Sequence, residues 1–379
     1  MIPITKPDMD ESEARAASES ILSGWITQGP RVAEFEAAFA GVVGADHACA
    51  VSNCTAAMHL TLLAAGVGPG DEVITASHSF IATANSVRYC GAEPIFVDID
   101  SGTFNMDPAK VQEAITDRTR AILCVHQMGM PCELDAILGV ARERGIAVIE
   151  DAACAAGSEV LVDGSWESVG RPHGDVACFS FHPRKVISTG EGGMLTTKNP
   201  EMDRNFRIAR HQGMSVSDTE RHGASQVIFE SYPTIGYNYR MTDIQAAIGL
   251  KQVERLAGLV ARRRALAERY GEILSGISGL ALPFEPEWAR SNWQSYCVRL
   301  PEGCDQRKVM QHMLDHGVST RRGIMCSHLE APYAGATLRH LLPESVRAQA
   351  QCVLIPLFPQ MSELEQNQVA EALSDGCAV

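Results

Sequence analysis

Apolar and polar positions alternate along this chain in a way that predicts a series of strands and helices. Short, nearly continuous apolar runs predict buried strands, and they fall at residues 48–51, 72–75, 94–97, 121–125, 146–149, 178–181 and 194–197. Apolar residues at helical spacing lie between the first five runs, at residues 55–65, 81–90, 110–115 and 133–144. Strands that alternate with helices predict an α/β fold with a mostly parallel central sheet covered on both faces.

The two ends of the chain follow a different pattern. Helical spacing predicts helices at residues 10–22 and 31–42, the second opened by Pro30, and a long helix at residues 242–273. A short strand at 296–300 and helices at 306–316 and 362–374 then predict a smaller α+β unit. We therefore expect a large domain of residues 1–250 and a small C-terminal domain of residues 251–379, which suits a chain of 379 residues.

Composition narrows the classes of function. The formal net charge is −14, so nucleic acid is not an expected partner. The basic run Arg262–Arg264 lies in a predicted helix and is expected to form a solvated face. No apolar run could span a bilayer, and the start MIPITKPDMD has no features of a secretory signal, so we expect a cytoplasmic protein with free thiols.

The 12 cysteines include no C-x-x-C pair. Cys124 and Cys132 flank His126, but their spacing fits no common zinc motif. We interpret these cysteines as small buried side chains and expect no metal site.

Lys185 is a candidate catalytic residue in the segment ACFSFHPRKVISTGEGG. It follows a short apolar strand and precedes a Gly-rich turn, at the strand end where ligands bind in open α/β sheets. Desolvation can lower the pKa of a lysine enough for its amine to form an imine with an aldehyde. The alternative from spacing alone is a surface lysine on a loop.

Asp151 ends another apolar run, AVIED. Glu150 and Asp151 point to opposite faces if the strand persists, so only one of them needs to enter a site. A carboxylate here could hold the pyridine nitrogen of pyridoxal phosphate (PLP) protonated, which makes the ring an electron sink. A helix N-cap is the alternative for Asp151.

The segment SNCTAAMHL predicts a helix start after a strand. Asn53 or Thr55 can cap this helix, and the N–H groups of its first turn can bind a phosphate. Plain capping without a phosphate is the alternative. Ser180 and Asn238 could each add a hydrogen bond to a phosphate oxygen.

The order of these features resembles the DegT/DnrJ/EryC1/StrS family of PLP-dependent sugar aminotransferases over most of the chain. The matching runs are GWITQGPRVAEFEAAFA, VSNCTAAMHLTLLAAGVGPGDEVITASHSFIATANSV, GAEPIFVDID, VIEDAACAAGS, CFSFHPRKVISTGEGGMLTT, GYNYRMTDIQAAIGL and IPLFPQMSELE. The Ser-Phe-x-Pro-x-Lys and GYNYR elements are the most specific. The resemblance implies a fold-type I transferase.

The resemblance also implies roles around the cofactor ring. Lys185 matches the lysine that holds PLP as a Schiff base, and Asp151 matches the acid paired with the pyridine nitrogen. Phe80 matches the aromatic residue that stacks on the ring. Cys154 stands near the phenolic oxygen of the cofactor, where many members have Gln or His, and a thiol is a weaker donor.

Further roles concern the phosphate. Thr55 and Ala56 match the phosphate-binding helix start, where Cys54 replaces the Gly of many members, and Ser180 matches a second phosphate contact. Asn238 matches an asparagine that reaches the phosphate from the neighbouring subunit. The resemblance therefore implies a homodimer with shared active sites.

The implied reaction moves an amino group from glutamate or glutamine to a keto-sugar, most simply a nucleotide-linked one. A relative of this family that removes a hydroxyl has His in place of the lysine; here Lys185 is present and His182 lies three residues before it, which disfavours a dehydrase. An aminotransferase acting on a keto-inositol and a PLP-binding regulator without turnover remain alternatives.

Two loop-like stretches, residues 211–232 and 319–333, are candidates for substrate contact. In the second, Arg321, Arg322 and His328 could meet anionic or hydroxylated groups, although ordinary surface polarity explains each as well. His78, in a Ser-His-Ser run where Ser-Phe-Thr is commoner in the family, is expected to be a packed or surface residue rather than a substrate contact.

Overall fold

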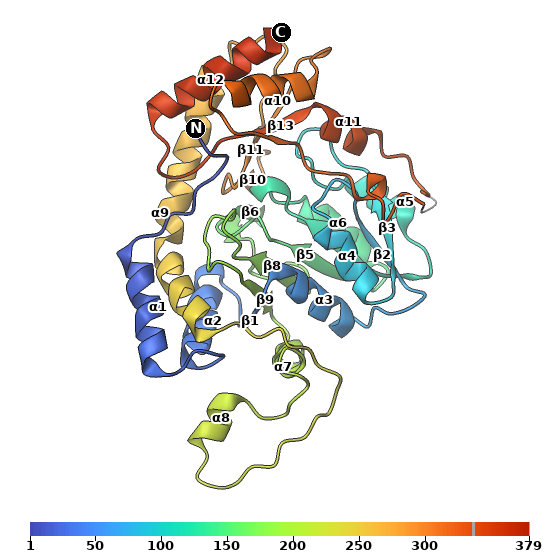
Figure 1. Ribbon diagram of the computed structural model, residues 1–379. Helices are drawn as coiled ribbons and strands as arrows, with labels where there is room; N and C mark the ends of the chain where they lie inside the picture. Colours follow the sequence, from blue (N-terminus) through green and yellow to red (C-terminus); the bar gives the residue numbers. More distant parts are fainter. Residues whose placement is uncertain (336–337, 379) are drawn as a thin grey trace.

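A seven-stranded sheet forms the centre of the computed structural model, which describes residues 1–335 and 338–378 (Figure 1). Across the sheet the strands are β1 (His47–Val51), β9 (Gly193–Thr197), β8 (Val176–Ser180), β5 (Ala147–Asp151), β4 (Thr119–Val125), β2 (Glu72–Ala76) and β3 (Glu93–Val97). Only the two pairings of β9, with β1 and β8, are antiparallel. The expectation of an α/β fold with a mostly parallel sheet is confirmed.

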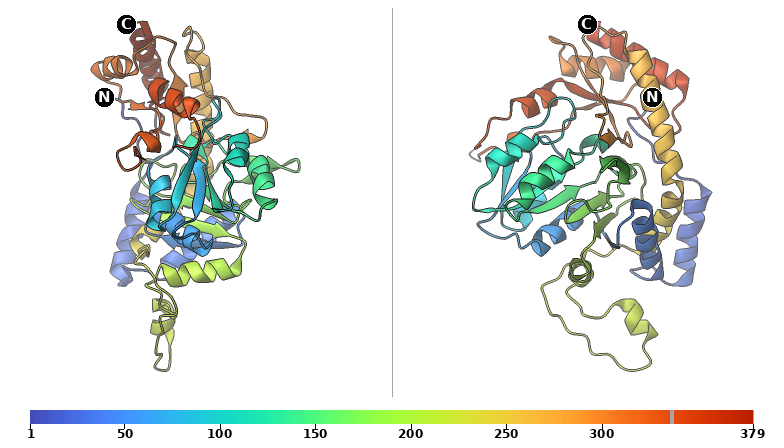
Figure 2. Two further views of the ribbon diagram at one scale, coloured as in Figure 1. Left: turned by 90° about the vertical axis from the view of Figure 1, so that its right-hand side faces the viewer. Right: turned by 180° about the vertical axis from the view of Figure 1, so that it is seen from behind.

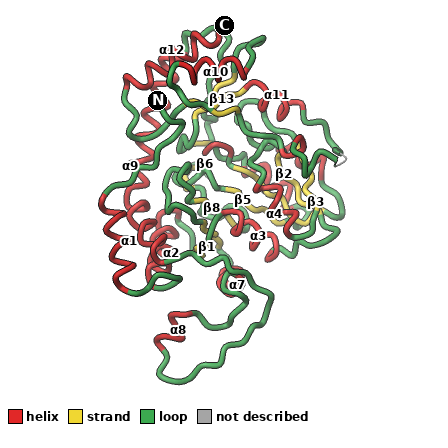
Figure 3. The backbone as a smooth tube through the Cα atoms, viewed as in Figure 1, coloured by secondary structure: helices red, strands yellow, loops and turns green. Residues whose placement is uncertain are grey.

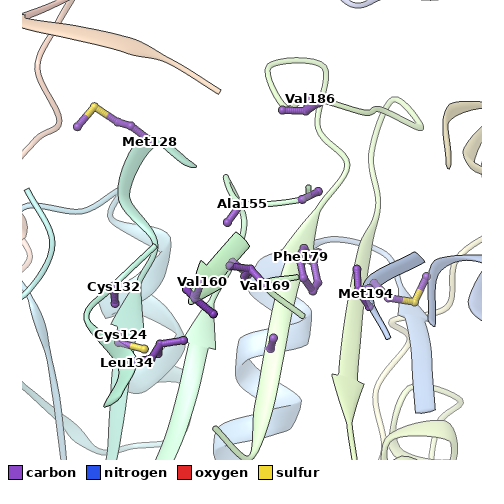
Figure 4. Close-up of a cluster of buried hydrophobic side chains, with 14 of the residues drawn as sticks. Cys124, Met128, Cys132, Leu134, Ala155, Val160, Val169, Phe179, Val186 and Met194 are labelled. Carbon is purple, nitrogen blue, oxygen red and sulfur yellow. The ribbon is translucent and has the colours of Figure 1, made fainter. Parts of the chain in front are cut away.

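Both faces of this sheet are buried, because alternate residues of one strand point to opposite sides. In β8, Ala177 and Phe179 join one hydrophobic cluster, while Val176 and Cys178 join another. Part of the first cluster is drawn in Figure 4. Helices that contribute to the first cluster are α2 (Pro30–Val43), α5 (Pro108–Ala114) and α6 (Leu134–Arg142). Helices that contribute to the second are α3 (Cys54–Ala64), α4 (Ala82–Tyr89) and α7 (Pro200–Ala209).

The helix α9 (Asp243–Leu274) connects two hydrophobic cores (Figure 1). It begins with a capping box between Thr242 and Gln245. Its first half packs on the central-sheet core and on α1 (Glu11–Ser23), whereas its second half places Tyr270 in a C-terminal core. The helix passes residue 250 without a break, and the domain division at that residue stays a prediction.

One prediction about this helix, that Arg263 is solvated, was wrong. The run Arg262–Arg264 was expected to form a solvated face, but Arg263 is 1% exposed. Its Nη1 donates to three backbone carbonyls, of Trp293, Gln294 and Leu357, at 3.2–3.3 Å. The sequence did not indicate this because the carbonyl partners come from distant loops.

The C-terminal region, residues 275–378, packs above the carboxyl ends of the parallel strands (Figures 1 and 2). Its antiparallel sheet has the order β11 (Tyr296–Arg299), β13 (Cys352–Ile355) and β12 (Arg321–Arg322). Its helices are α10 (Gln306–Asp315), the short 3-10 turn η2 (Ser327–Leu329), α11 (Pro343–Gln351) and α12 (Glu363–Ala378). Ile2 of the N-terminal segment also packs in this core and bridges to Val318.

Several elements were not predicted because they are short or weakly patterned. A third sheet joins β10 (Ala289–Arg290), β6 (Glu159–Val162) and β7 (Ser165–Ser168), and a 3-10 turn, η1, spans Gln127–Gly129. The helix α8 (Asp218–Gly223) lies in a long loop that extends away from the body of the molecule (Figures 1 and 3). No helix in the described part of the chain is long and apolar enough to cross a membrane.

Candidate active site

A cavity of about 710 Å³ lies at the carboxyl edge of the parallel strands. Its floor comes from the ends of β5 and β8 and from the first residues of α3 and α4. The C-terminal region supplies the opposite wall, with residues 294–295, 321, 324, 354–355 and 357. The cavity lies at the sheet edge where an open α/β fold binds its ligands.

Lys185 lies in this cavity, five residues beyond the end of β8. Its backbone N–H donates to the carbonyl of His182 at 2.8 Å, and its Nζ donates to the Cys154 Sγ at 3.1 Å. Burial alone would lower the pKa of the amine, but Cys154 and Asp151 raise it above its usual value. Lys185 is therefore a cavity amine, and the alternative of a surface lysine is excluded.

Asp151 lies in the same cavity, at the end of β5. Burial raises the pKa of its carboxyl group, against the lowering effect of its hydrogen bonds and of Lys185. Its Oδ2 accepts from the Thr83 Oγ1 at 2.9 Å and its Oδ1 from the Ala153 N–H at 3.2 Å. A buried carboxylate of this kind is stabilised by a cation placed against it.

Glu150 points away from the cavity, as the strand pattern predicted. Its Oε2 lies 3.0 Å from the His126 Nε2, and its Oε1 accepts from the backbone N–H groups of His173 and Gly174. The backbone N–H of Cys132 in turn donates to the His126 Nδ1. His126 and Cys132 thus belong to a buried network behind the cavity.

Phe80 contributes an aromatic surface to the cavity. Phe80 lines the cavity and is 61% exposed, so its ring is accessible from the cavity. The position is the one expected for stacking on a flat ring.

The start of α3 forms another part of the cavity wall. The Asn53 Oδ1 caps the helix by accepting from the Ala56 N–H at 2.8 Å, so the first-turn N–H of Thr55 remains available for an anion. Asn53, Thr55, Ala56 and Ser180 all line the cavity. Helix capping and phosphate binding, the two interpretations of this segment, are therefore compatible.

Asn238 is the one predicted cofactor residue that does not line this cavity. It is exposed and forms an isolated bridge with His211 at the base of the projecting loop. Its role toward a neighbouring subunit stays a prediction.

Cys154 combines a cavity-facing thiol with a firmly held backbone. Its carbonyl accepts from the Asn292 Nδ2 at 2.8 Å, and the same Nδ2 also donates to the Ala156 carbonyl. Residues 154–156 are therefore joined directly to the C-terminal region.

Several cavity residues were not found from the sequence. Thr83, which holds Asp151, lies on α4, and Arg184, Tyr239 and Gln294 also line the cavity. Two of them stood in segments that the sequence singled out: Arg184 adjoins Lys185, and Tyr239 lies in the GYNYR element. Thr83 and Gln294 are single polar residues whose position depends on tertiary packing.

The residues that were candidates for substrate contact lie in different surroundings. Arg321 lines the cavity, whereas Arg322 pairs with Glu330 at 3.3 Å.

His328 is buried, with its Nδ1 2.6 Å from the Ser77 Oγ. His78 is fully buried beside Phe104, so the expectation of a packed residue is confirmed.

Together these groups fit PLP. One cavity holds an amine, a buried carboxylate, an exposed aromatic ring and a helix N-terminus, which suit the aldehyde, the pyridine nitrogen, the ring face and the phosphate of this cofactor. Asp151 ends β5 and the helix N-terminus is that of α3, while Lys185 and Phe80 lie in the segments that follow β8 and precede α4.

Comparisons with known proteins find relatives over nearly the whole chain. The model of the DegT/DnrJ/EryC1/StrS aminotransferase family matches residues 7–374. The chain is 37% identical over 381 residues to the spore coat polysaccharide biosynthesis protein SpsC of Bacillus subtilis (strain 168), covering 99% of this chain and 96% of that protein. The crystal structure of the aminotransferase TlmJ from Streptoalloteichus hindustanus is 34% identical, with a TM-score of 0.91 and coverage of 100% and 99%. The PLP-form of Spr1654 from Streptococcus pneumoniae is 28% identical, with a TM-score of 0.91 and coverage of 100% and 98%.

Proposed function

The chain belongs to the DegT/DnrJ/EryC1/StrS aminotransferase family, and from this premise we propose that it transfers the amino group of glutamate or glutamine to a nucleotide-linked keto-sugar. The protein is a PLP-dependent aminotransferase of a family that acts on sugars. The observation that carries the proposal is the presence of Lys185 and Asp151 in one cavity at the carboxyl edge of the sheet.

Named residues would hold the cofactor. Lys185 would bind its aldehyde covalently, Asp151 its pyridine nitrogen, and Phe80 the face of its ring. The start of α3 at Thr55 and Ala56, together with Ser180, would bind the phosphate; the Thr55 N–H is the direct donor, since the Ala56 N–H already donates to the Asn53 Oδ1. When bound, PLP supplies an aldehyde that takes up an amino group and a protonated ring that withdraws electrons.

Lys185 also acts as the acid–base group of the reaction. Its Nζ takes the proton from the α-carbon of the amino donor and later returns a proton during amino transfer to the sugar. The hydrogen bonds from Thr83 and Ala153 favour the charged form of Asp151 against the effect of burial, and a charged carboxylate would keep a ring nitrogen protonated. The C-terminal region covers one side of the cavity.

A homodimer with shared active sites is part of the proposal. Two observations support it: Asn238 is exposed outside the cavity of its own chain, and the projecting loop carries exposed apolar side chains. The largest of these exposures are at Val227, Phe229 and Ile235 (85%, 91% and 83%). Apolar groups on a projecting loop are expected to be covered by another chain.

The test is a substrate screen. The PLP-loaded protein is incubated with glutamate or glutamine and a panel of nucleotide-linked 3-keto and 4-keto sugars, and the keto-acid product and the amino sugar are measured by mass spectrometry. Formation of both in equal amounts supports the proposal. A keto-inositol is tested as a further acceptor, and amination of this compound instead of the sugars would favour the cyclitol alternative. Absence of turnover on every acceptor would favour a PLP-binding regulator.

A further inference from the structure

We propose that Cys154 and Lys185 form an oxidation site, at which a peroxide joins the two side chains through a covalent bond between sulfur and nitrogen. The formation of this bond depends only on the contact between the two side chains. Its consequence, that the oxidised chain cannot bind PLP covalently, rests on the proposed function, because that function assigns the aldehyde of the cofactor to Lys185.

The sulfur and the amine are in direct contact inside the cavity. The Lys185 Nζ lies 3.1 Å from the Cys154 Sγ, and both residues line the cavity. The Cys154 carbonyl accepts from the Asn292 Nδ2 at 2.8 Å. The Lys185 N–H donates to the His182 carbonyl at 2.8 Å. The contact therefore joins two side chains whose backbones are each held by a hydrogen bond.

Cys154 differs from most of the other cysteines in its access to solvent. Nine of the 12 cysteines are buried, and only Cys154, Cys304 and Cys377 are partly exposed. Neither Cys304 nor Cys377 lines the cavity. A small oxidant from solution can therefore reach Cys154, and the sulfur that it oxidises lies next to the lysine amine.

Cys54 also lines the cavity, but it is a poorer target for an oxidant. It is buried, and its Sγ donates to the Cys178 carbonyl at 3.5 Å. Burial raises the pKa of the Cys54 thiol well above its usual value. Because the thiolate is the form that reacts, Cys54 stays largely unreactive. An oxidised Cys154 therefore meets the Lys185 amine rather than a second reactive thiol.

The reaction takes two balanced steps. The Cys154 sulfur attacks one oxygen of hydrogen peroxide, and the O–O bond breaks to give a sulfenic acid and water; the sulfur gives up two electrons, which reduce the peroxide. The uncharged Lys185 Nζ then attacks this sulfur, the S–O bond breaks, and the hydroxide leaves with a proton from the nitrogen as a second water. A thiol such as dithiothreitol reverses the reaction: it breaks the S–N bond, restores the thiol and the amine, and is itself oxidised to a disulfide.

The S–N bond decides whether the cofactor can attach to the chain. A lysine nitrogen bonded to sulfur retains one hydrogen, whereas forming an imine with an aldehyde removes two. Conversely, a lysine already bound to the aldehyde has no free amine to attack the sulfur. The site therefore responds to peroxide in the cofactor-free protein and is protected when PLP is bound.

Peptide mapping of the oxidised protein tests the inference. Cofactor-free and PLP-loaded protein are treated with hydrogen peroxide, digested and analysed by tandem mass spectrometry. We expect the cofactor-free wild type to contain a cross-link between residues 154 and 185, lighter than the two separate groups by the mass of molecular hydrogen, and to lose it in dithiothreitol. Cys154→Ser and Lys185→Ala should give no cross-link, whereas the control Cys304→Ser should retain it. Thermal melts check that each variant is folded.

Uptake of PLP, followed by absorbance, separates the bond from its consequence. We expect uptake to be lost when the cross-link forms and to return after dithiothreitol. Oxidation of Cys154 to a sulfinic acid alone, or a disulfide between Cys54 and Cys154, would show that the inference is wrong. A cross-link that leaves PLP uptake intact would contradict the proposed attachment of the cofactor to Lys185 and leave the oxidation site standing.

Discussion

The Lys185 Nζ donates a hydrogen bond to the Cys154 Sγ at 3.1 Å. The two residues come from different segments, one after β8 and the other after β5, and the carbonyl of Cys154 is tied to Asn292. Through this contact Cys154 raises the pKa of the Lys185 amine, against the lowering effect of burial. Cys154 therefore influences how readily the amine loses its proton.

The first prediction concerns Cys154→Ala. Without the sulfur, burial dominates and the pKa of Lys185 falls, so more of the amine is uncharged at a given pH. The rate at which the apoprotein takes up PLP, followed by absorbance, should reach its half-maximum at a lower pH than in the wild type. Cys304→Ala, a partly exposed cysteine of the C-terminal region, serves as the control and should keep the wild-type profile. Identical profiles for Cys154→Ala and wild type would refute the role.

The second prediction concerns Thr83→Val. Its hydroxyl stabilises the charged form of Asp151, so its loss raises the pKa of a carboxyl that burial already raises. The acid side of the pH profile of turnover should therefore move to higher pH, by about one unit. Thr197→Val lies at the opposite end of the sheet, and its profile should not move. A Thr83→Val profile that coincides with the wild type would contradict the role of Thr83.

The third prediction concerns the shared active site. Lys185→Ala and Asn238→Ala should each be strongly impaired alone. If Asn238 serves the neighbouring subunit, mixing and refolding the two variants should restore about a quarter of wild-type activity, because each hybrid contains one intact site. A mixture no more active than its components would argue against sharing.

The fourth prediction concerns stability. Arg263→Ala removes a buried guanidinium that donates to the carbonyls of Trp293, Gln294 and Leu357. We expect the free energy of unfolding, measured in urea, to fall by about 3 kcal/mol or more. The neighbour Arg262 is exposed and donates to the carbonyls of Pro359 and Met361, and Arg262→Ala should cost less than about 1 kcal/mol. Equal losses in both variants would show that burial of Arg263 has no special energetic importance.

Much of the large sheet could be predicted because its strands are continuous apolar runs bounded by helices with clear spacing. The same pattern placed Asp151 and Ser180 at strand ends, and therefore at one edge of the sheet. The β6–β7 hairpin was missed because its residues, such as Trp166 and Glu167, lack a regular apolar alternation.

Other parts of the site depend on contacts between distant segments. Thr83 and Asp151 are 68 residues apart, and Gln294 reaches Arg184 across 110 residues. No local pattern marks such pairs, and the same reason explains why the buried Arg263 could not be told from its exposed neighbour. The roles assigned through family resemblance filled part of this gap, since they place residues without requiring their contacts.

The most direct test of the central claim is the location of the cofactor on the chain. The purified protein is loaded with PLP, reduced with borohydride, digested and analysed by mass spectrometry. The account predicts one modified peptide, carrying the reduced cofactor on Lys185, and loss of the visible absorbance band of lysine-bound PLP in Lys185→Ala. A modification on another lysine, or a band that persists in the variant, would contradict it.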